Sequence, residues 1–196
     1  MRWRTIRPSR ARRLGALMLT AVLAACSSPD PVLYTIAPVA GTPHNSGPRV
    51  IVLERVDVAR YLDRSQIVLS SENYRLDVKS NDWWGEPLGA MLTRVLRQEL
   101  GERLPQSTII NENGAVTATP DATVELDLQR LDEDAAGNLI LQAQASVNFK
   151  GNRAPVLRSF HLSVPSSATG TPGAVAAVST AVSQLADGLA VMLAGA

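Results

Sequence analysis

The sequence predicts an α+β fold in a single compact domain, with a mainly antiparallel or mixed sheet of about seven or eight strands and two amphipathic helices. In several segments apolar and polar residues alternate, which is the period of a half-buried strand. In two others apolar residues recur every three or four positions, which is the period of a helix. A basic and then apolar N-terminus precedes this domain and predicts an exported protein.

The first 25 residues are predicted to be a lipoprotein signal peptide. Residues 1–13 carry six arginines and no acid, and the apolar run 14–25 is too short to span a bilayer. The run ends in Leu23-Ala24-Ala25-Cys26, which matches a lipobox. Cleavage between Ala25 and Cys26 would leave the only cysteine of the chain as the lipid-modified first residue. An ordinary signal-peptidase site also accepts these small residues, and the cysteine would then stand there by chance.

The lipid expected on Cys26 is a diacylglycerol with an N-acyl chain such as palmitate. No cofactor is expected besides this covalent lipid. Two or more acyl chains anchor a protein stably. The residue after the cysteine is Ser27. An aspartate at this position would favour retention at the inner membrane, whereas serine is typical of lipoproteins sorted to the outer membrane of Gram-negative bacteria. Cleavage removes six of the 19 basic residues and none of the 18 acidic ones, so the mature charge is near −5, which argues against nucleic-acid binding.

Residues 26–48 are predicted to be the lipidated N-terminus and a tether, because five prolines in so short a segment resist regular structure. A short edge strand is expected inside it, at 32–36. The domain proper is placed at 49–196. Alternating or continuous apolar segments predict its strands at 50–58, 67–69, 74–78, 108–110, 124–128, 139–149 and 160–164.

The individual strands follow from their patterns. The continuous apolar start of 50–58 indicates a buried strand, and in 74–78 the side chains of Tyr74, Leu76 and Val78 are expected to face inward. The segments 124–128, 139–149 and 160–164 alternate cleanly and are separated by turn residues. They predict an antiparallel meander with one wet face.

The first helix is predicted between Trp84 and Leu104, where apolar residues fall at helical spacing. Asp82 is the expected N-cap, and Pro87 places the regular start near Glu86. Pro105 ends the helix.

The second helix is predicted at 172–193, with a regular apolar stripe on one side and mostly alanine, serine and threonine on the other. A charge at Asp187 argues against a transmembrane helix. We expect one side to pack on the sheet and the other, which includes Ala181, to contact a second subunit or partner. Composition bias toward alanine is the alternative.

The sequence shows no pattern of catalytic or metal-ligating residues, and we expect the protein not to be an enzyme. His44 and His161 lack metal-ligand spacing, and no nucleophile elbow, phosphate loop or dinucleotide fingerprint occurs. Glu125 and Asp127 share one side of a strand, as a catalytic carboxylate pair would. We expect them instead to be ordinary charged residues on the solvent-facing side of that strand.

Two places are candidate partner-binding surfaces. Tyr61-Leu62-Asp63-Arg64 combines an aromatic residue with charged neighbours, which either cap a loop or form a binding hot spot. At Trp83-Trp84, the second tryptophan is in phase with Leu88 and is assigned to the core. Trp83 is therefore the candidate for an exposed contact with protein or lipid.

Several pieces together resemble the PqiC-type family of ABC-type transport auxiliary lipoproteins. They are the lipobox, Leu33-Tyr34-Thr35, Tyr61-Leu62-Asp63-Arg64 with Gln66-Ile67-Val68 after it, and Trp84 with Glu86-Pro87-Leu88. The resemblance covers nearly all of the mature chain and implies a compact α+β domain without catalytic residues.

The resemblance also implies a role in envelope lipid transport. The expected partner is a periplasmic MCE-domain (mammalian-cell-entry) protein with its membrane permease and ATPase, which the lipoprotein would dock from the outer membrane. A homo-oligomer is expected, because such partners are ring-shaped. The alternatives are a stand-alone structural lipoprotein that maintains the envelope, and a periplasmic lipid carrier with a large apolar cavity.

Overall fold

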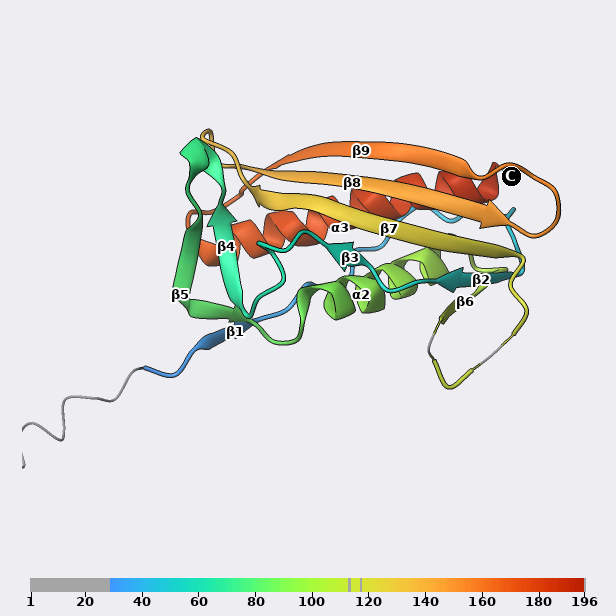
Figure 1. Cartoon of the computed structure of the whole chain (residues 1–196), viewed down its shortest axis with the longest axis horizontal. Coiled ribbons are helices and arrows are strands. Elements are labelled where there is room, and N and C mark those ends of the chain that lie inside the picture. The colour runs from blue at the N-terminus through green and yellow to red at the C-terminus, as the bar shows by residue number, and fades with distance from the viewer. Residues whose placement is uncertain (1–28, 113, 117, 196) are drawn as a thin grey trace, which may run out of the picture. The chain divides into compact units, whose positions relative to one another are not determined.

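The computed structural model describes residues 29–112, 114–116 and 118–195, so the predicted signal peptide and Cys26 lie outside the described residues. Its main compact unit, Pro31–Ala196, has the predicted α+β fold with a nine-stranded mixed sheet and two long helices (Figure 1). The strands are β1 (Val32–Tyr34), β2 (Val50–Leu53), β3 (Asp57–Val58), β4 (Gln66–Ser70), β5 (Asp77–Trp84), β6 (Thr108–Asn111), β7 (Ala122–Glu133), β8 (Asn138–Phe149) and β9 (Val156–Pro165). The helices are α2 (Leu88–Arg103) and α3 (Thr171–Ala194).

The long strand β7 holds the sheet together. Along one edge it pairs in parallel with β2, then β3, then β4, each over one to three residues. Along the other edge it pairs antiparallel with β8, which pairs with β9. The predicted meander is therefore correct, and β7 is longer than expected at both ends. At its C-terminal end, a bulge between Leu128 and Arg130 lets the pairing with β8 continue to Glu133.

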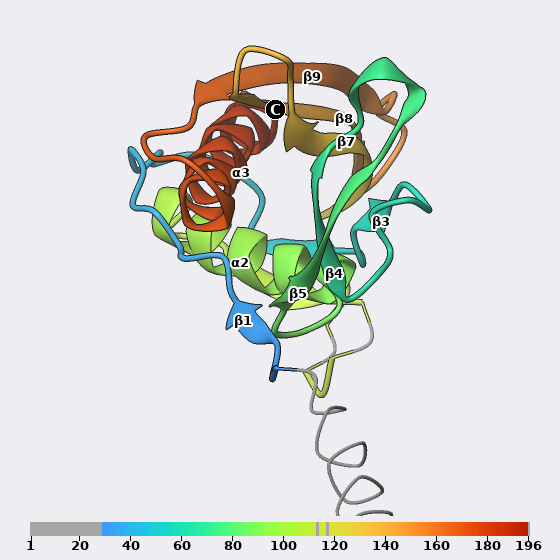
Figure 2. The same ribbon diagram turned by 90° about the vertical axis from the view of Figure 1, so that its left-hand side faces the viewer.

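The two helices pack side by side under the sheet. Figure 2 shows α2 and α3 next to one another, with β8 and β9 over α3. The inward side chains of β7 and β8, such as Val124, Leu141 and Val147, are fully buried, while Glu125 and Asp127 on the outer face are exposed. This is the alternation expected of a sheet with one covered face.

The start of the first helix differs from the prediction. Strand β5 continues through Trp84, and α2 begins at Leu88 with Pro87 at the N-cap, so Asp82 is not a cap. The backbone of this stretch pairs with β1 on one side and β4 on the other, and these ladders keep it extended. Trp84 is in the core as predicted, only 8% exposed, but it projects from a strand.

The second helix is also buried more completely than its composition suggests. In α3 only a narrow stripe faces solvent: Pro172, Ala176, Thr180, Gln184, Asp187 and Val191. Ala181 is fully buried, so the expected subunit contact through this position is wrong. The small residues permit a close approach, but α2 and the N-terminal segment of the same domain make it. The helix is long and apolar enough to cross a membrane, yet two thirds of it is buried inside the domain.

The predicted tether contributes to the fold, and the compact unit begins at Pro31 rather than at residue 49. After β1, residues 35–48 form what we call the strap, which runs along the two helices (Figure 1). Ile36 is buried. The hydrogen bonds that hold the strap include Ala37 N to Ser179 Oγ at 3.2 Å, His44 N to Arg103 O at 2.7 Å and Ser46 Oγ to Ala194 O at 3.1 Å. Proline prevents regular structure here but not packing.

Arg103, at the end of α2, joins the strap to both helices and is completely buried. Its Nε donates to Asp187 on α3 at 2.6 Å, Nη1 to the carbonyl of Val39 at 3.3 Å, and Nη2 to Ser183 Oγ at 2.7 Å. Glu99 lies one turn earlier and accepts the Val39 N–H at 2.8 Å. Burial raises the pKa of the Glu99 carboxyl above its usual range.

Two glycines of α2 make a matched pair for testing how closely the helix is packed. A Cβ on Gly89 would lie 2.7 Å from the backbone oxygen of Val56, whereas a Cβ on Gly101 would meet nothing within 4 Å. We expect Gly101→Ala to raise the free energy of unfolding by up to about 1 kcal/mol through helix propensity. We expect Gly89→Ala to lower it by about 1–3 kcal/mol, because a backbone carbonyl cannot move aside cheaply. Urea unfolding measures both, and equal effects would contradict the packing at Gly89.

Candidate functional site

The first predicted surface, Tyr61-Leu62-Asp63-Arg64, lies in the loop between β3 and β4 and divides into two roles. Leu62 is only 3% exposed, and its N–H donates to the carbonyl of Ala59 at 2.8 Å. Tyr61 is half-buried. Asp63 and Arg64 are exposed, as a partner contact requires. Two of the four residues therefore hold the loop, and the other two are available for binding.

Tyr61 anchors the loop through a partly buried ionic network centred on the buried carboxylate of Asp132. Its hydroxyl donates to Asp132 Oδ2 at 2.7 Å, and Arg130 Nε donates to the other oxygen of the same carboxylate at 2.8 Å. Arg130 also binds Glu72, at 2.7 Å. Burial, followed by the bond to Asp132, raises the pKa of the Tyr61 hydroxyl far above its usual range. The tyrosine is thus a neutral donor to a buried carboxylate, which is a structural role.

Asp63 and Arg64 border a hollow of about 400 Å³ between this loop and the β5–α2 corner, where residues 84–87 form the other wall. Two backbone bonds join the parts: Trp84 N to the carbonyl of Ser65, and Gly85 N to the carbonyl of Tyr34, both 2.8 Å. Three sequence segments that are far apart, 33–35, 61–68 and 84–88, therefore meet at one corner of the domain. The hollow is bordered by the carboxylates of Asp63 and Glu86 and by the guanidinium of Arg64, which makes it a surface suited to binding.

The second candidate, Trp83, is half-buried on β5 and not at a helix start. It lies in register with Leu33 of β1 on one side and Gln66 of β4 on the other. Its Nε1 donates to the carbonyl of Ser80 at 3.0 Å. Because neighbouring residues of a strand point to opposite faces, Trp83 faces away from the core that holds Trp84.

Tyr74 is an exposed aromatic residue that the strand pattern misplaced. Instead of facing inward, it is fully exposed in a 3₁₀ turn, Glu72–Tyr74, at the tip of the β4–β5 hairpin. Both Asn73 and Tyr74 have positive φ, 54° and 61°, which a residue with a side chain rarely adopts. Leu76 beside it is 39% exposed. Asn73 was the available signal, since asparagine tolerates this conformation and favours a turn.

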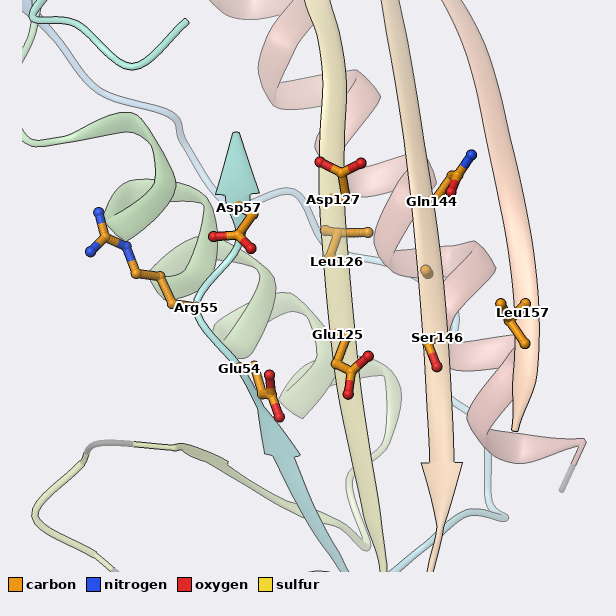
Figure 3. Close-up of a pocket in the computed structure, with 10 residues that line it drawn as sticks. Glu54, Arg55, Asp57, Glu125, Leu126, Asp127, Gln144, Ser146 and Leu157 are labelled. Carbon is orange, nitrogen blue, oxygen red and sulfur yellow. The ribbon is translucent and has the colours of Figure 1, made fainter. Parts of the chain in front are cut away.

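Glu125 and Asp127 border an acidic groove on the outer face of the sheet (Figure 3). Glu54 and Asp57 line its other side, and the groove holds about 310 Å³. Partial burial, and then the charges of Glu125, Glu112 and Asp57, raise the pKa of Glu54. Within residues 29–112, 114–116 and 118–195, no three histidine, cysteine or acidic side chains are placed to hold a metal ion. The exposed carboxylates fit the predicted solvated face.

Comparison with known proteins places this geometry in context. A family model described as ABC-type transport auxiliary lipoprotein component matches residues 33–190, which is most of the chain. No curated protein matches the chain.

Two solved structures share the fold. A crystal structure of an uncharacterised protein has a TM-score of 0.70 at 18% identity, covering 83% of this chain and 97% of its own. A Xanthomonas campestris protein of the DUF330 family has a TM-score of 0.67 at 20% identity, covering 81% of this chain and 92% of its own.

Proposed function

Because the chain belongs to the ABC-type transport auxiliary lipoprotein component family, we propose that it is a non-catalytic outer-membrane subunit of an MCE-type lipid transporter. Membership confirms the resemblance drawn from the lipobox and the motifs. In this proposal the lipid on Cys26 anchors the domain on the periplasmic face of the outer membrane. The domain docks the far end of a periplasmic MCE-domain protein, whose permease and ATPase lie in the inner membrane.

The family match over residues 33–190 carries the proposal, and two structural features support it. The compact unit begins at Pro31, only five residues after Cys26, so a lipid there would hold the domain close to the membrane. The exposed groups at Asp63, Arg64 and Tyr74 provide contacts of the kind that protein partners use. A ring-shaped partner favours assembly of several copies of the lipoprotein around it.

The packing of the core supports a docking subunit over a lipid carrier. A carrier would need a cavity between the inward face of β8 and α3. There the side chains of Leu141, Val147 and Leu189 are fully buried and belong to one hydrophobic core cluster with both elements. A stand-alone structural lipoprotein remains the second candidate, and capture of partners separates it from the proposal.

The test is affinity capture of the tagged full-length lipoprotein from detergent-solubilised outer membranes. We expect an MCE-domain protein in the captured material. Cys26→Ser should keep the domain folded, by circular dichroism, but move it to the soluble periplasmic fraction. Repeated capture without any MCE-domain protein would reject the docking role, and membrane retention of Cys26→Ser would reject the anchor.

Charge reversal tests the surface. Arg64→Glu should lower the captured MCE-domain protein at least tenfold, since it removes the guanidinium and adds a third carboxylate to a hollow that already holds Asp63 and Glu86. Arg97→Glu, at an exposed arginine on α2, is the matched control and should leave capture unchanged. Equal capture by both variants would show that the hollow does not bind the partner.

A further inference from the structure

We propose that the domain makes a second membrane contact besides the lipid anchor, through the exposed Leu33 of β1 and the adjacent Trp83. We call this surface, formed by Leu33 and Trp83, the β1 patch. The inference rests on the proposed lipidation of Cys26, because the anchor is what brings the patch to the lipid surface.

The β1 patch is unusual in its exposure. Leu33 is 64% exposed, although β1 is a regular strand of the sheet. In the strand order β1 lies at one end, paired with β5 alone. Leu33 is in register with Trp83, so their side chains lie on the same face, whereas the next pair, Tyr34 and Trp84, packs against the core. The edge strand thus carries the apolar side chain of Leu33 outward beside a tryptophan.

The short chain between the lipid and the β1 patch favours the membrane as the surface that covers the patch. Val32 follows Cys26 by six residues. Even fully extended, six residues span only about 20 Å. The covalent tether makes contact with the membrane an intramolecular event, so a patch too small to bind lipid from solution has a high effective concentration at the bilayer. A second copy or a protein partner has no such advantage at this position.

The chemistry of the patch fits the membrane–water interface. Tryptophan prefers this region because its ring is apolar and its N–H is polar. The N–H of Trp83 is already satisfied by Ser80 at 3.0 Å, which fixes the ring and leaves its apolar surface for contact. Leu33 beside it adds aliphatic area without a charge of its own.

A contact at the β1 patch would orient the domain. Figure 1 shows β1 at one end of the domain and the β8–β9 turn with the end of α3 at the other. With β1 against the bilayer, the β8–β9 end points away from the membrane. The hollow at Asp63 and Arg64 lies near the membrane, because residues 84–87 of the β5–α2 corner line it.

The mature chain offers a direct probe, since only Trp83 and Trp84 remain after removal of residues 1–25. The test is to reconstitute the lipidated full-length protein into phosphatidylethanolamine–phosphatidylglycerol vesicles with brominated acyl chains. Bromine quenches the fluorescence of a tryptophan that contacts the acyl chains. Relative to unbrominated vesicles, we expect Trp84→Phe to lose at least half of its fluorescence and Trp83→Phe to lose almost none. If Trp84→Phe folds poorly, the unsubstituted protein replaces it: its fluorescence should be quenched, and Trp83→Phe should remove that quenching.

Leu33→Ser should abolish most of the quenching, because it removes the aliphatic half of the contact. Leu157→Ser is the matched control: Leu157 is 75% exposed on the edge strand β9, far from the anchor in sequence. It should leave the quenching unchanged.

Vesicle flotation separates failure of this inference from failure of the proposed function. Protein that floats with the vesicles but shows no bromine quenching at Trp83 overturns the membrane contact and leaves the anchor intact. Protein that carries no lipid at Cys26 by mass spectrometry, and does not float, overturns the premise. Quenching that disappears when the protein is diluted within the vesicles would assign the β1 patch to a second copy and overturn the proposal.

Discussion

Arg103→Ala is expected to lower the free energy of unfolding by about 2–5 kcal/mol, because it truncates a large, completely buried side chain and leaves buried hydrogen-bond acceptors without a donor. The guanidinium is completely buried and binds the strap at Val39, α3 at Ser183 and the carboxylate of Asp187. Without it, buried acceptors lose their donors. Glu99 also loses its nearest positive charge.

The same variant should release the strap before the rest of the domain. The Cβ of any larger residue at Gly41 would collide with this guanidinium, which shows how closely the strap lies on it. In Arg103→Ala, amide hydrogen exchange in residues 36–44 should therefore quicken more than exchange in β7 and β8.

Arg97→Ala is the matched control, because it makes the same change on an exposed face of the same helix. Its effect should stay within about 0.5 kcal/mol. Urea unfolding gives both values. A loss of under 1 kcal/mol for Arg103→Ala would mean that the strap does not depend on this arginine.

Ala181→Arg is expected to prevent folding, or to cost more than about 4 kcal/mol, because it forces a charged side chain into a site with no exposed surface. The sequence favoured a different result, in which this substitution disturbs an assembly of folded subunits. The two are easily separated by circular dichroism and size-exclusion chromatography. A folded Ala181→Arg protein with an altered oligomeric state would restore the interface.

Ala176→Arg is the control on the same helix. Ala176 belongs to the exposed stripe of α3, and an arginine there projects into solvent. The free energy of unfolding should change by no more than about 0.5 kcal/mol. A large loss at Ala176 would mean that another surface covers this stripe.

The candidate site was predicted only in part. The motif residues at 61–64 and 84–88 were identified, but no property of either segment shows that they share one hollow. Tyr61 was a candidate contact because it is aromatic, and its bond to Asp132 arises from pairing far along the chain. Tyr74 was placed inward because the alternation of Tyr74, Leu76 and Val78 fits a strand. The positive φ of the turn interrupts that alternation.

The sequence by itself determined the periodic elements and their apolar faces: the strands β7, β8 and β9, the helices α2 and α3, and the assignment of Trp84 to the core. The spacing of apolar residues shows which side of a helix or strand is buried, and in these elements that spacing is visible within the segment itself. Tertiary structure alone decided what covers the other sides. The strap packs although it is rich in proline, and the small-residue side of α3 meets α2 within one domain. Contacts between residues 60 to 150 positions apart create both features, and local patterns do not encode them.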